Sequence, residues 1–312
     1  MEKKPLIKNT IKYISSVLIL TITLAFNLYS NAATPAYSNQ STLKQYILPV
    51  QHGQLAYYRF GHGSPMVLIT GYGATLSEWN NTFLYTLAKS HEIIVFDNRG
   101  VGNSIFSTNS YNIRDLSNDT AQLITKLHLN KPTIVGWSMG GMVAQELAIQ
   151  NPTLIGKLVL MNTKMGGNSA IPTASDIEEK LTDKSGTHEE KFNRVMHILF
   201  PMTDVDDMSK AFVANMFKPG GKPEPSVIPS VLLKQKTLLK NWQTANDIPQ
   251  KLRQLNVPTL ILSGSEDVII PPQNAVILAD TIPGSQLVII KNGGHAMMYQ
   301  YPKIIAEDID KS

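Results

Sequence analysis

Residues 132–140 read Pro-Thr-Ile-Val-Gly-Trp-Ser-Met-Gly and decide the fold of this chain. The stretch joins a short apolar run, typical of a buried strand, to a G-x-S-x-G pentapeptide. Glycines flank Ser138 because a sharp strand-to-helix turn crowds its backbone and leaves no room for a Cβ. Such a turn exposes the serine hydroxyl beside the first amides of the next helix. The pentapeptide therefore predicts a nucleophile beside part of an anion site; the alternative is an ordinary strand-to-helix turn.

Apolar runs with strand character recur along the chain. The first two are separated by His52-Gly53, a hairpin signal. From Pro65 onward the runs are nearly continuous in Val, Ile and Leu and alternate with helical patterns, as parallel strands covered on both faces do. The sequence predicts an α/β fold with a mostly parallel eight-stranded sheet and helices on both faces. The expected strands are Tyr46–Val50, Gln54–Phe60, Pro65–Thr70, Glu92–Phe96, Thr133–Gly136, Lys157–Asn162, Thr259–Ser263 and Gln286–Ile290.

The alternation of strands and helices is interrupted once, after the sixth strand. Residues 165–256 contain amphipathic stretches at Glu189–Phe200, Asp207–Phe217 and Val231–Asn241 but no buried strand run. We call this segment the helical insertion and expect it to act as a lid that shapes the substrate pocket. It divides the expected core into residues 46–164 and 257–312.

The N-terminus has the layout of a secretory signal peptide. Four lysines precede an apolar run at about residues 14–28, and Ser30-Asn-Ala32 offers small residues for cleavage. The alternative is an uncleaved membrane anchor, but the run is short and interrupted by Ser, Thr and Asn. We therefore predict a signal peptide at residues 1–32, a flexible lead-in at 33–45 and an exported protein, with membrane attachment only if cleavage fails.

Charge and cysteine content exclude several classes of function. The net charge of the chain is +4, and residues 1–32 contribute four lysines and Glu2, so the remainder carries about +1. Because Lys and Arg form no cluster, we expect no nucleic-acid partner. The chain has no cysteine, which rules out disulfides, thiolate metal sites and a thiol nucleophile. We expect no cofactor and no metal.

A serine nucleophile needs a base, and the base needs an orienting group. Of the seven histidines, His295 stands apart, because it follows the last strand in the loop Asn292-Gly-Gly-His. Asp267 follows the preceding strand at the same expected sheet edge, and its neighbour Glu266 is the local rival. The order Ser138, Asp267, His295 is the one expected for a nucleophile elbow.

The oxyanion donors are expected from two loops. Gly71-Tyr72-Gly73 follows the third strand, and its glycines let the backbone approach a ligand closely. We assign the backbone N–H groups of Tyr72 and Met139 as the hole. A phosphate-binding loop is the weaker alternative, because the chain lacks the G-x-x-x-x-G-K-[ST] pattern. Candidates for the substrate pocket are Trp137, His197 and Trp242.

With these residues located, the chain resembles the α/β-hydrolase fold superfamily, in its serine esterase and lipase-like branch. The resemblance rests on GYG at 71–73, DNRGVGNS at 97–104, GWSMGG at 136–141, GSEDVIIP at 264–271 and GGH at 293–295. It implies Ser138 as nucleophile, His295 as general base and acid, and Asp267 as orienting carboxylate, with oxyanion donation from Tyr72 and Met139. Many members of the superfamily have His where this chain has Thr70, a departure that concerns the oxyanion loop. A structural turn is the preferred interpretation of Asp97 to Ser104.

The sequence thus predicts an exported serine hydrolase acting on a small or medium ester, lactone or related acyl compound. One alternative is a non-catalytic or slow ligand-binding member of the fold. Another is an aminopeptidase-like member, for which Glu178, Glu179, Glu189 or Glu190 would bind a free amine. A C–C bond hydrolase is a third, since GWSMGG also resembles those relatives. The sequence leaves the substrate and the oligomeric state open.

Overall fold

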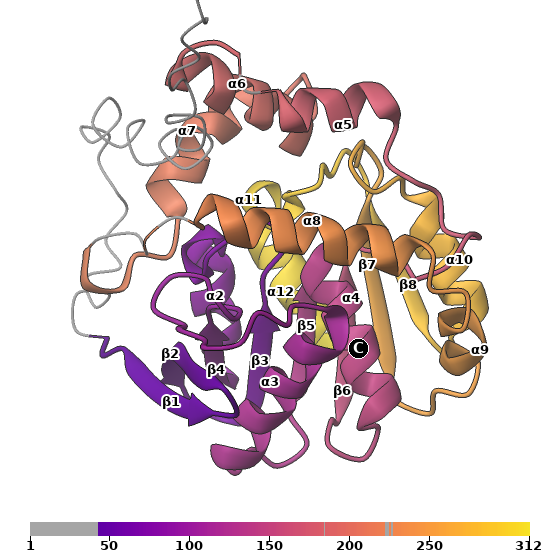
Figure 1. Ribbon diagram of the computed structural model, residues 1–312. Coiled ribbons are helices and arrows are strands. Elements are labelled where there is room, and N and C mark those ends of the chain that lie inside the picture. The colour runs from indigo at the N-terminus through magenta and orange to yellow at the C-terminus, as the bar shows by residue number, and fades with distance from the viewer. Residues whose placement is uncertain (1–42, 184, 222–224, 226) are drawn as a thin grey trace, which may run out of the picture.

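The computed structural model describes residues 43–312 except 184, 222–224 and 226. In this part of the chain one eight-stranded sheet has the order β1-β2-β4-β3-β5-β6-β7-β8 (Figure 1). β2 pairs antiparallel with β1 and β4, and all other neighbouring strands are parallel. The predicted mostly parallel sheet is confirmed. The strands are β1 (Tyr46–Val50), β2 (Gly53–Gly61), β3 (Ser64–Ile69), β4 (His91–Phe96), β5 (Thr133–Trp137), β6 (Lys157–Met161), β7 (Thr259–Gly264) and β8 (Gln286–Ile290).

Helices cover both faces of the sheet. Alternate strand residues enter two hydrophobic cores, as Met66 and Leu68 do on one face and Val67 and Ile69 on the other. The first core includes residues of α2 (Asn81–Leu87), α11 (Met297–Gln300) and α12 (Pro302–Lys311). The second includes residues of α3 (Ile113–Lys126), α4 (Met139–Gln150) and α10 (Gln273–Thr281). Burial on both faces explains why the central strands are continuously apolar.

The helical insertion separates β6 from β7, and the helices of its first part are drawn above the sheet in Figure 1. Its described residues form no named strand. The three predicted amphipathic stretches correspond to α6 (His188–Leu199), α7 (Val205–Asn215) and α8 (Pro229–Gln243). Two α-helices of the insertion were not predicted. α5 (Ser175–Thr182) has only Ile177 and Leu181 as apolar residues, and α9 (Ile248–Leu252) is too short to show a period.

The predicted signal peptide, residues 1–32, lies outside the described residues, as does most of the predicted lead-in. Within the part that the structure describes, no helix combines the length and the apolar character needed to cross a bilayer.

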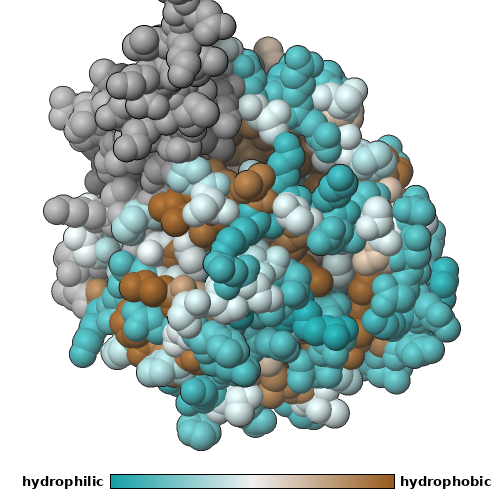
Figure 2. Space-filling view, viewed as in Figure 1, coloured by the Kyte–Doolittle hydropathy of each residue, from teal (hydrophilic) through white to brown (hydrophobic). Residues whose placement is uncertain are grey.

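The surface shown in Figure 2 is mostly hydrophilic, with hydrophobic residues in small separate patches. Large apolar side chains that are exposed include Ile105, Met202 and Leu233. Single exposed apolar residues are ordinary on globular proteins. The predicted site residues instead meet at the carboxyl edge of the sheet.

Candidate active site

Ser138 lies on a strained turn between β5 and α4, with φ 58° and ψ −121°. A Cβ on Gly136 would lie 2.5 Å from the carbonyl oxygen of Gly140, and one on Gly140 would overlap the carbonyl of Ile69. Larger residues are therefore excluded on both sides of the serine. The turn keeps the serine side chain half-buried rather than fully enclosed. The local structure is thus the strand, turn and helix that the pentapeptide predicts.

The structure brings Ser138, His295 and Asp267 together. Ser138 Oγ lies 3.0 Å from His295 Nε2, and His295 Nδ1 lies 2.8 Å from Asp267 Oδ2. The other carboxylate oxygen accepts the backbone N–H groups of Ile269 and Ile270, each at 2.9 Å. Because a carboxylate only accepts hydrogen bonds, Nδ1 carries the proton and Nε2 is free to accept the serine proton. The arrangement has the geometry of a nucleophile, a base and an orienting acid.

The two predicted oxyanion donors lie in the loop after β3 and at the first residue of α4. A Cβ on Gly71 would lie 3.1 Å from Ser138 Cβ, so the loop that carries Tyr72 passes directly beside the serine. Met139 is the first residue of α4, where backbone N–H groups have no partner within the helix. Among the described residues, neither the Tyr72 nor the Met139 N–H has a protein acceptor. Both amides are available to an anion.

Thr70, where many relatives have His, is buried at the start of the oxyanion loop. Its hydroxyl and its backbone carbonyl lie 3.3 and 3.4 Å from Nδ2 of the buried Asn98, which donates to both. The loop is therefore supported from the turn after β4 rather than by a histidine of its own.

Sequence reasoning missed Asn162 and Thr163, which follow β6. Asn162 Nδ2 donates to the carbonyls of Gly294 and His295 at 2.8 and 2.7 Å, and its Oδ1 accepts from Gly264 N at 3.1 Å. Thr163 Oγ1 donates to the Ser138 carbonyl at 2.7 Å. These two neighbouring residues thus bond the histidine loop, the acid strand and the serine turn. The only signal in the sequence was their place at a strand end.

We expect Asn162→Gly to lower kcat about tenfold to a hundredfold and to destabilise the fold by about 2 kcal/mol. Glycine accepts the φ of 45° at this position, so the loss reflects the amide bonds rather than the backbone. Steady-state kinetics and thermal unfolding measure the two effects. Thr187→Ala, which removes the N-cap of α6, is the control and should lower stability alone, because among the described residues the Thr187 side chain bonds only Glu190. A kcat unchanged by Asn162→Gly would show that the amide only stabilises the fold.

The three predicted pocket residues occupy different places. Trp137 is buried, and its indole Nε1 donates to the His295 carbonyl at 2.9 Å, so it supports the histidine loop. Trp242 is buried in the second core and donates to the Lys164 carbonyl at 3.3 Å. His197 is exposed and bonds the Asn193 carbonyl of its own helix through Nδ1 at 2.7 Å. Among the described residues, no hydrogen bond joins any of these three side chains to Ser138, and the Trp137 ring packs 5.7 Å from the His295 ring. A helical period cannot tell which helix face meets the sheet.

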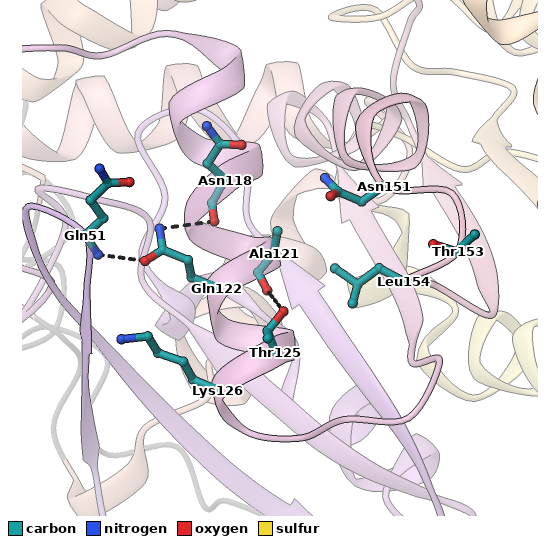
Figure 3. Close-up of a pocket in the computed structure, with 9 residues that line it drawn as sticks. All are labelled: Gln51, Asn118, Ala121, Gln122, Thr125, Lys126, Asn151, Thr153 and Leu154. Carbon is teal, nitrogen blue, oxygen red and sulfur yellow. Dashed lines mark hydrogen bonds between the residues drawn. The ribbon is translucent and has the colours of Figure 1, made fainter.

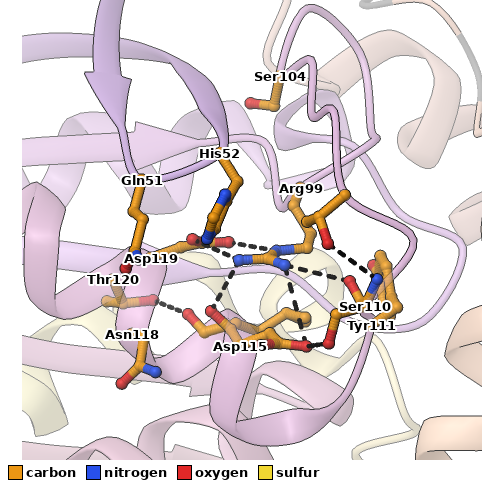
Figure 4. A network of polar contacts seen from close by, with 12 residues as sticks. Gln51, His52, Arg99, Ser104, Ser110, Tyr111, Asp115, Asn118, Asp119 and Thr120 are labelled. Atoms are coloured by element: carbon orange, nitrogen blue, oxygen red, sulfur yellow. Dashed lines mark hydrogen bonds and ion pairs between the residues drawn. The ribbon is translucent and has the colours of Figure 1, made fainter.

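Asp97 and Arg99 form structural contacts, as the sequence interpretation prefers. Asp97 accepts the Leu76 N–H at 2.8 Å. Arg99 makes a two-pronged ion pair with Asp119 at 2.7 and 2.8 Å, and its guanidinium lies 4.5 Å from the centre of the Phe106 ring. Figure 4 shows the guanidinium directed at α3, where Asp115 also lies. This network ties the turn after β4 to α3.

Glu78 is a second residue that sequence reasoning missed. It lies in the 3-10 helix Leu76–Glu78 and is almost fully buried. Burial raises its carboxyl pKa to about 7, although hydrogen bonds from the Thr75 N–H and hydroxyl act in the opposite direction. The Tyr299 hydroxyl donates to its backbone carbonyl at 3.1 Å. The carboxyl is thus a pH-sensitive group a few residues after the oxyanion loop.

We expect the stability of the protein to fall as the pH rises from about 4.5 to about 7, because of Glu78. The folded state binds this proton more tightly than the unfolded chain, so the contribution is complete below the unfolded pKa and is lost above the folded one. The loss amounts to about 3 kcal/mol. Glu78→Gln should therefore have a higher Tm than the wild type at pH 8, with a difference that shrinks toward pH 5. The exposed Glu266→Gln is the control; equal Tm profiles for wild type and Glu78→Gln would contradict the prediction.

A depression of about 640 Å³ lies elsewhere on the molecule. Figure 3 shows α3 between Gln51 on one side and the turn that precedes β6 on the other, with Gln122 directed at Gln51, whose backbone N–H it accepts at 2.7 Å. Ser138, Asp267 and His295 are not among its residues, so this depression is not the candidate active site. Its lining consists of Gln51, Asn118, Ala121, Gln122, Thr125, Lys126, Asn151, Thr153 and Leu154.

The sheet topology and the geometry of the site are those of the α/β hydrolases. The family model described as alpha/beta hydrolase fold matches residues 64–302, and the chain belongs to this family. A protein of Mycobacterium tuberculosis named as the non-heme bromoperoxidase BpoC is 27% identical over 262 residues, which is 80% of this chain and 94% of that protein. A protein of Pseudomonas savastanoi pv. phaseolicola, named as the carbamate hydrolase RutD, is 25% identical to this chain. The match covers 74% of this chain and 86% of that protein.

A solved structure has the same fold. The alpha/beta hydrolase fold protein from Chitinophaga pinensis superposes with a TM-score of 0.76 at 21% identity. The match covers 88% of this chain and 98% of that chain. At this identity the likeness concerns the fold. The family relationship and the relatives together support a hydrolase.

Proposed function

We propose that this protein is an exported serine hydrolase that cleaves a small or medium ester, lactone or related acyl compound. The observation that carries the proposal is the continuous pair of contacts from Ser138 Oγ to His295 Nε2, at 3.0 Å, and from His295 Nδ1 to Asp267, at 2.8 Å. A half-buried serine with a partnered histidine can act as a nucleophile, whereas an isolated hydroxyl is a weak one.

The reaction proceeds in two halves. Ser138 Oγ attacks the substrate carbonyl while His295 Nε2 takes its proton, and the N–H groups of Tyr72 and Met139 stabilise the oxyanion. His295 then gives the proton to the leaving alcohol, whose bond to the acyl carbon breaks. Water attacks the acyl-enzyme with His295 again as base, releasing the acid and restoring the Ser138 hydroxyl. The protein groups suffice for every proton transfer.

The relatives favour acyl-type carbonyl substrates. RutD is named as a carbamate hydrolase, and a carbamate presents a carbonyl that a serine nucleophile can attack. The aminopeptidase-like alternative is less favoured. The carboxylates that would bind a free amine, Glu178, Glu179, Glu189 and Glu190, are all exposed on the helical insertion.

Export is part of the proposal and rests on the order of charges and apolar residues in the first 32 residues. Mass spectrometry of the protein recovered outside the cytoplasm tests it. A mature N-terminus near residue 33 supports export with cleavage, and an intact Met1 in that fraction contradicts cleavage.

The decisive assay compares a series of p-nitrophenyl esters of increasing chain length with an amino-acid anilide. We expect ester turnover that is greatest for short or medium acyl chains, together with labelling of Ser138 by a fluorophosphonate probe. A preference for the anilide would favour the aminopeptidase-like alternative. Absence of both labelling and turnover in folded protein would refute the serine hydrolase and favour a ligand-binding protein.

A further inference from the structure

A buried glutamine of the helical insertion bonds the loop that carries Tyr72. Gln235, on α8, has no exposed surface. Its Oε1 accepts from the backbone N–H of Gly73 at 2.8 Å, and its Nε2 donates to the Tyr111 hydroxyl at 3.0 Å. Because both ends of the amide have partners, the side chain is held in one orientation.

Apolar residues of α8 also pack against the oxyanion loop and against the turn after β4. A Cβ on Gly73 would lie 3.2 Å from Leu232, and one on Gly100 would lie 2.9 Å from Val231. Val231 and Gln235 are four residues apart and share one helix face. Gln235 is therefore the polar contact of an otherwise apolar face of α8 packed over the oxyanion loop.

The oxyanion loop needs such an anchor because glycines flank Tyr72. Glycine has wide conformational freedom, and Gly73 adopts a positive φ of 66°. On one side the loop is held by the close approach of Gly71 to Ser138. On the other side the Gly73 N–H belongs to the peptide that follows Tyr72, so its bond to Gln235 fixes that peptide. Tyr72 lies between these two fixed points.

We propose that Gln235 is a positioning residue that keeps the Tyr72 N–H aimed at the oxyanion. The proposal rests on the proposed function, since it assumes that Tyr72 donates in the transition state. It gives the helical insertion a part in the rate of the reaction as well as in substrate binding. An oxyanion donor is effective only when it is held in place before the charge develops. Loss of the anchor should therefore lower kcat with little change in KM.

The kinetic test replaces Gln235 by residues of similar length. We expect Gln235→Met to lower kcat for a p-nitrophenyl ester about tenfold to a hundredfold, with KM changed less than about twofold. Gln235→Glu should restore most of the rate, because a carboxyl oxygen still accepts from Gly73 in either protonation state. The matched control is Gln243→Met on the same helix. Gln243 bonds the Ala170 carbonyl and Lys164 instead of the oxyanion loop and should leave kcat unchanged.

Hydrogen exchange followed by mass spectrometry tests the anchor without relying on activity. Peptides spanning Gly73 should exchange faster in Gln235→Met than in the wild type or in Gln243→Met. If the folded wild type shows neither ester turnover nor fluorophosphonate labelling, the proposed function fails, while the exchange experiment still tests the anchor. Should Gln235→Met not fold, Tyr111→Phe removes only the brace on the amide and should lower kcat severalfold. Equal kcat in Gln235→Met and Gln243→Met, a loss confined to KM, or unchanged exchange at Gly73 would overturn the proposal.

Discussion

Replacing Ser138 by Ala is expected to lower kcat for an activated ester by about a millionfold and to abolish labelling by a fluorophosphonate. The expected loss is large because the acyl-enzyme bond can form only at Ser138 Oγ, which lies 3.0 Å from the base His295. Substrate binding should persist, since the amides of Tyr72 and Met139 remain. Stopped-flow hydrolysis, gel-based probe labelling and ligand-binding calorimetry measure these three properties.

Ser138→Gly is the companion variant, and it separates catalysis from backbone strain. It too lacks the nucleophile, but glycine adopts φ 58° and ψ −121° without the strain that a Cβ causes. We expect it to be more stable than Ser138→Ala by about 1 kcal/mol. Residual labelling of either variant would place the nucleophile elsewhere, and a less stable glycine variant would argue against strain in the turn.

The fold could be predicted because single residues indicate where the backbone must turn tightly. Gly136 and Gly140 occupy positions where any Cβ would collide with backbone atoms, so their spacing marks the turn. The positions of Asp267 and His295 were predictable for a related reason. Parallel strands end at one edge of a sheet, so polar residues just after those strands come together.

Contacts made across long stretches of sequence could not be predicted. Asn162 bonds a carbonyl 133 residues away, and Gln235 bonds a backbone N–H 162 residues away. Neither residue differs in type or spacing from a surface amide. The pocket assignments of His197 and Trp242 stay predictions, because amphipathic spacing shows that a helix has a buried face but not what that face meets.

The second large expected effect on kcat concerns Asp267, the carboxylate assigned to orient His295. Asp267→Asn is expected to lower kcat by about 10⁴-fold while the fold remains intact. The Asn carbonyl oxygen can still accept from Ile269 and Ile270, which turns the NH2 group toward His295 Nδ1. That nitrogen must then accept, so the proton moves to Nε2, which can no longer take the serine proton.

The neighbouring carboxylate supplies the control for Asp267. Glu266 is exposed, whereas Asp267 is buried with His295 against one of its oxygens and two backbone amides on the other. Glu266→Gln should therefore retain kcat within about twofold, although it removes the same charge one residue away. The effect thus depends on which carboxylate fixes the imidazole tautomer, and not on the negative charge of the loop. If Glu266→Gln cost as much as Asp267→Asn, general electrostatics rather than tautomer control would explain the loss, and the role given to Asp267 would be wrong.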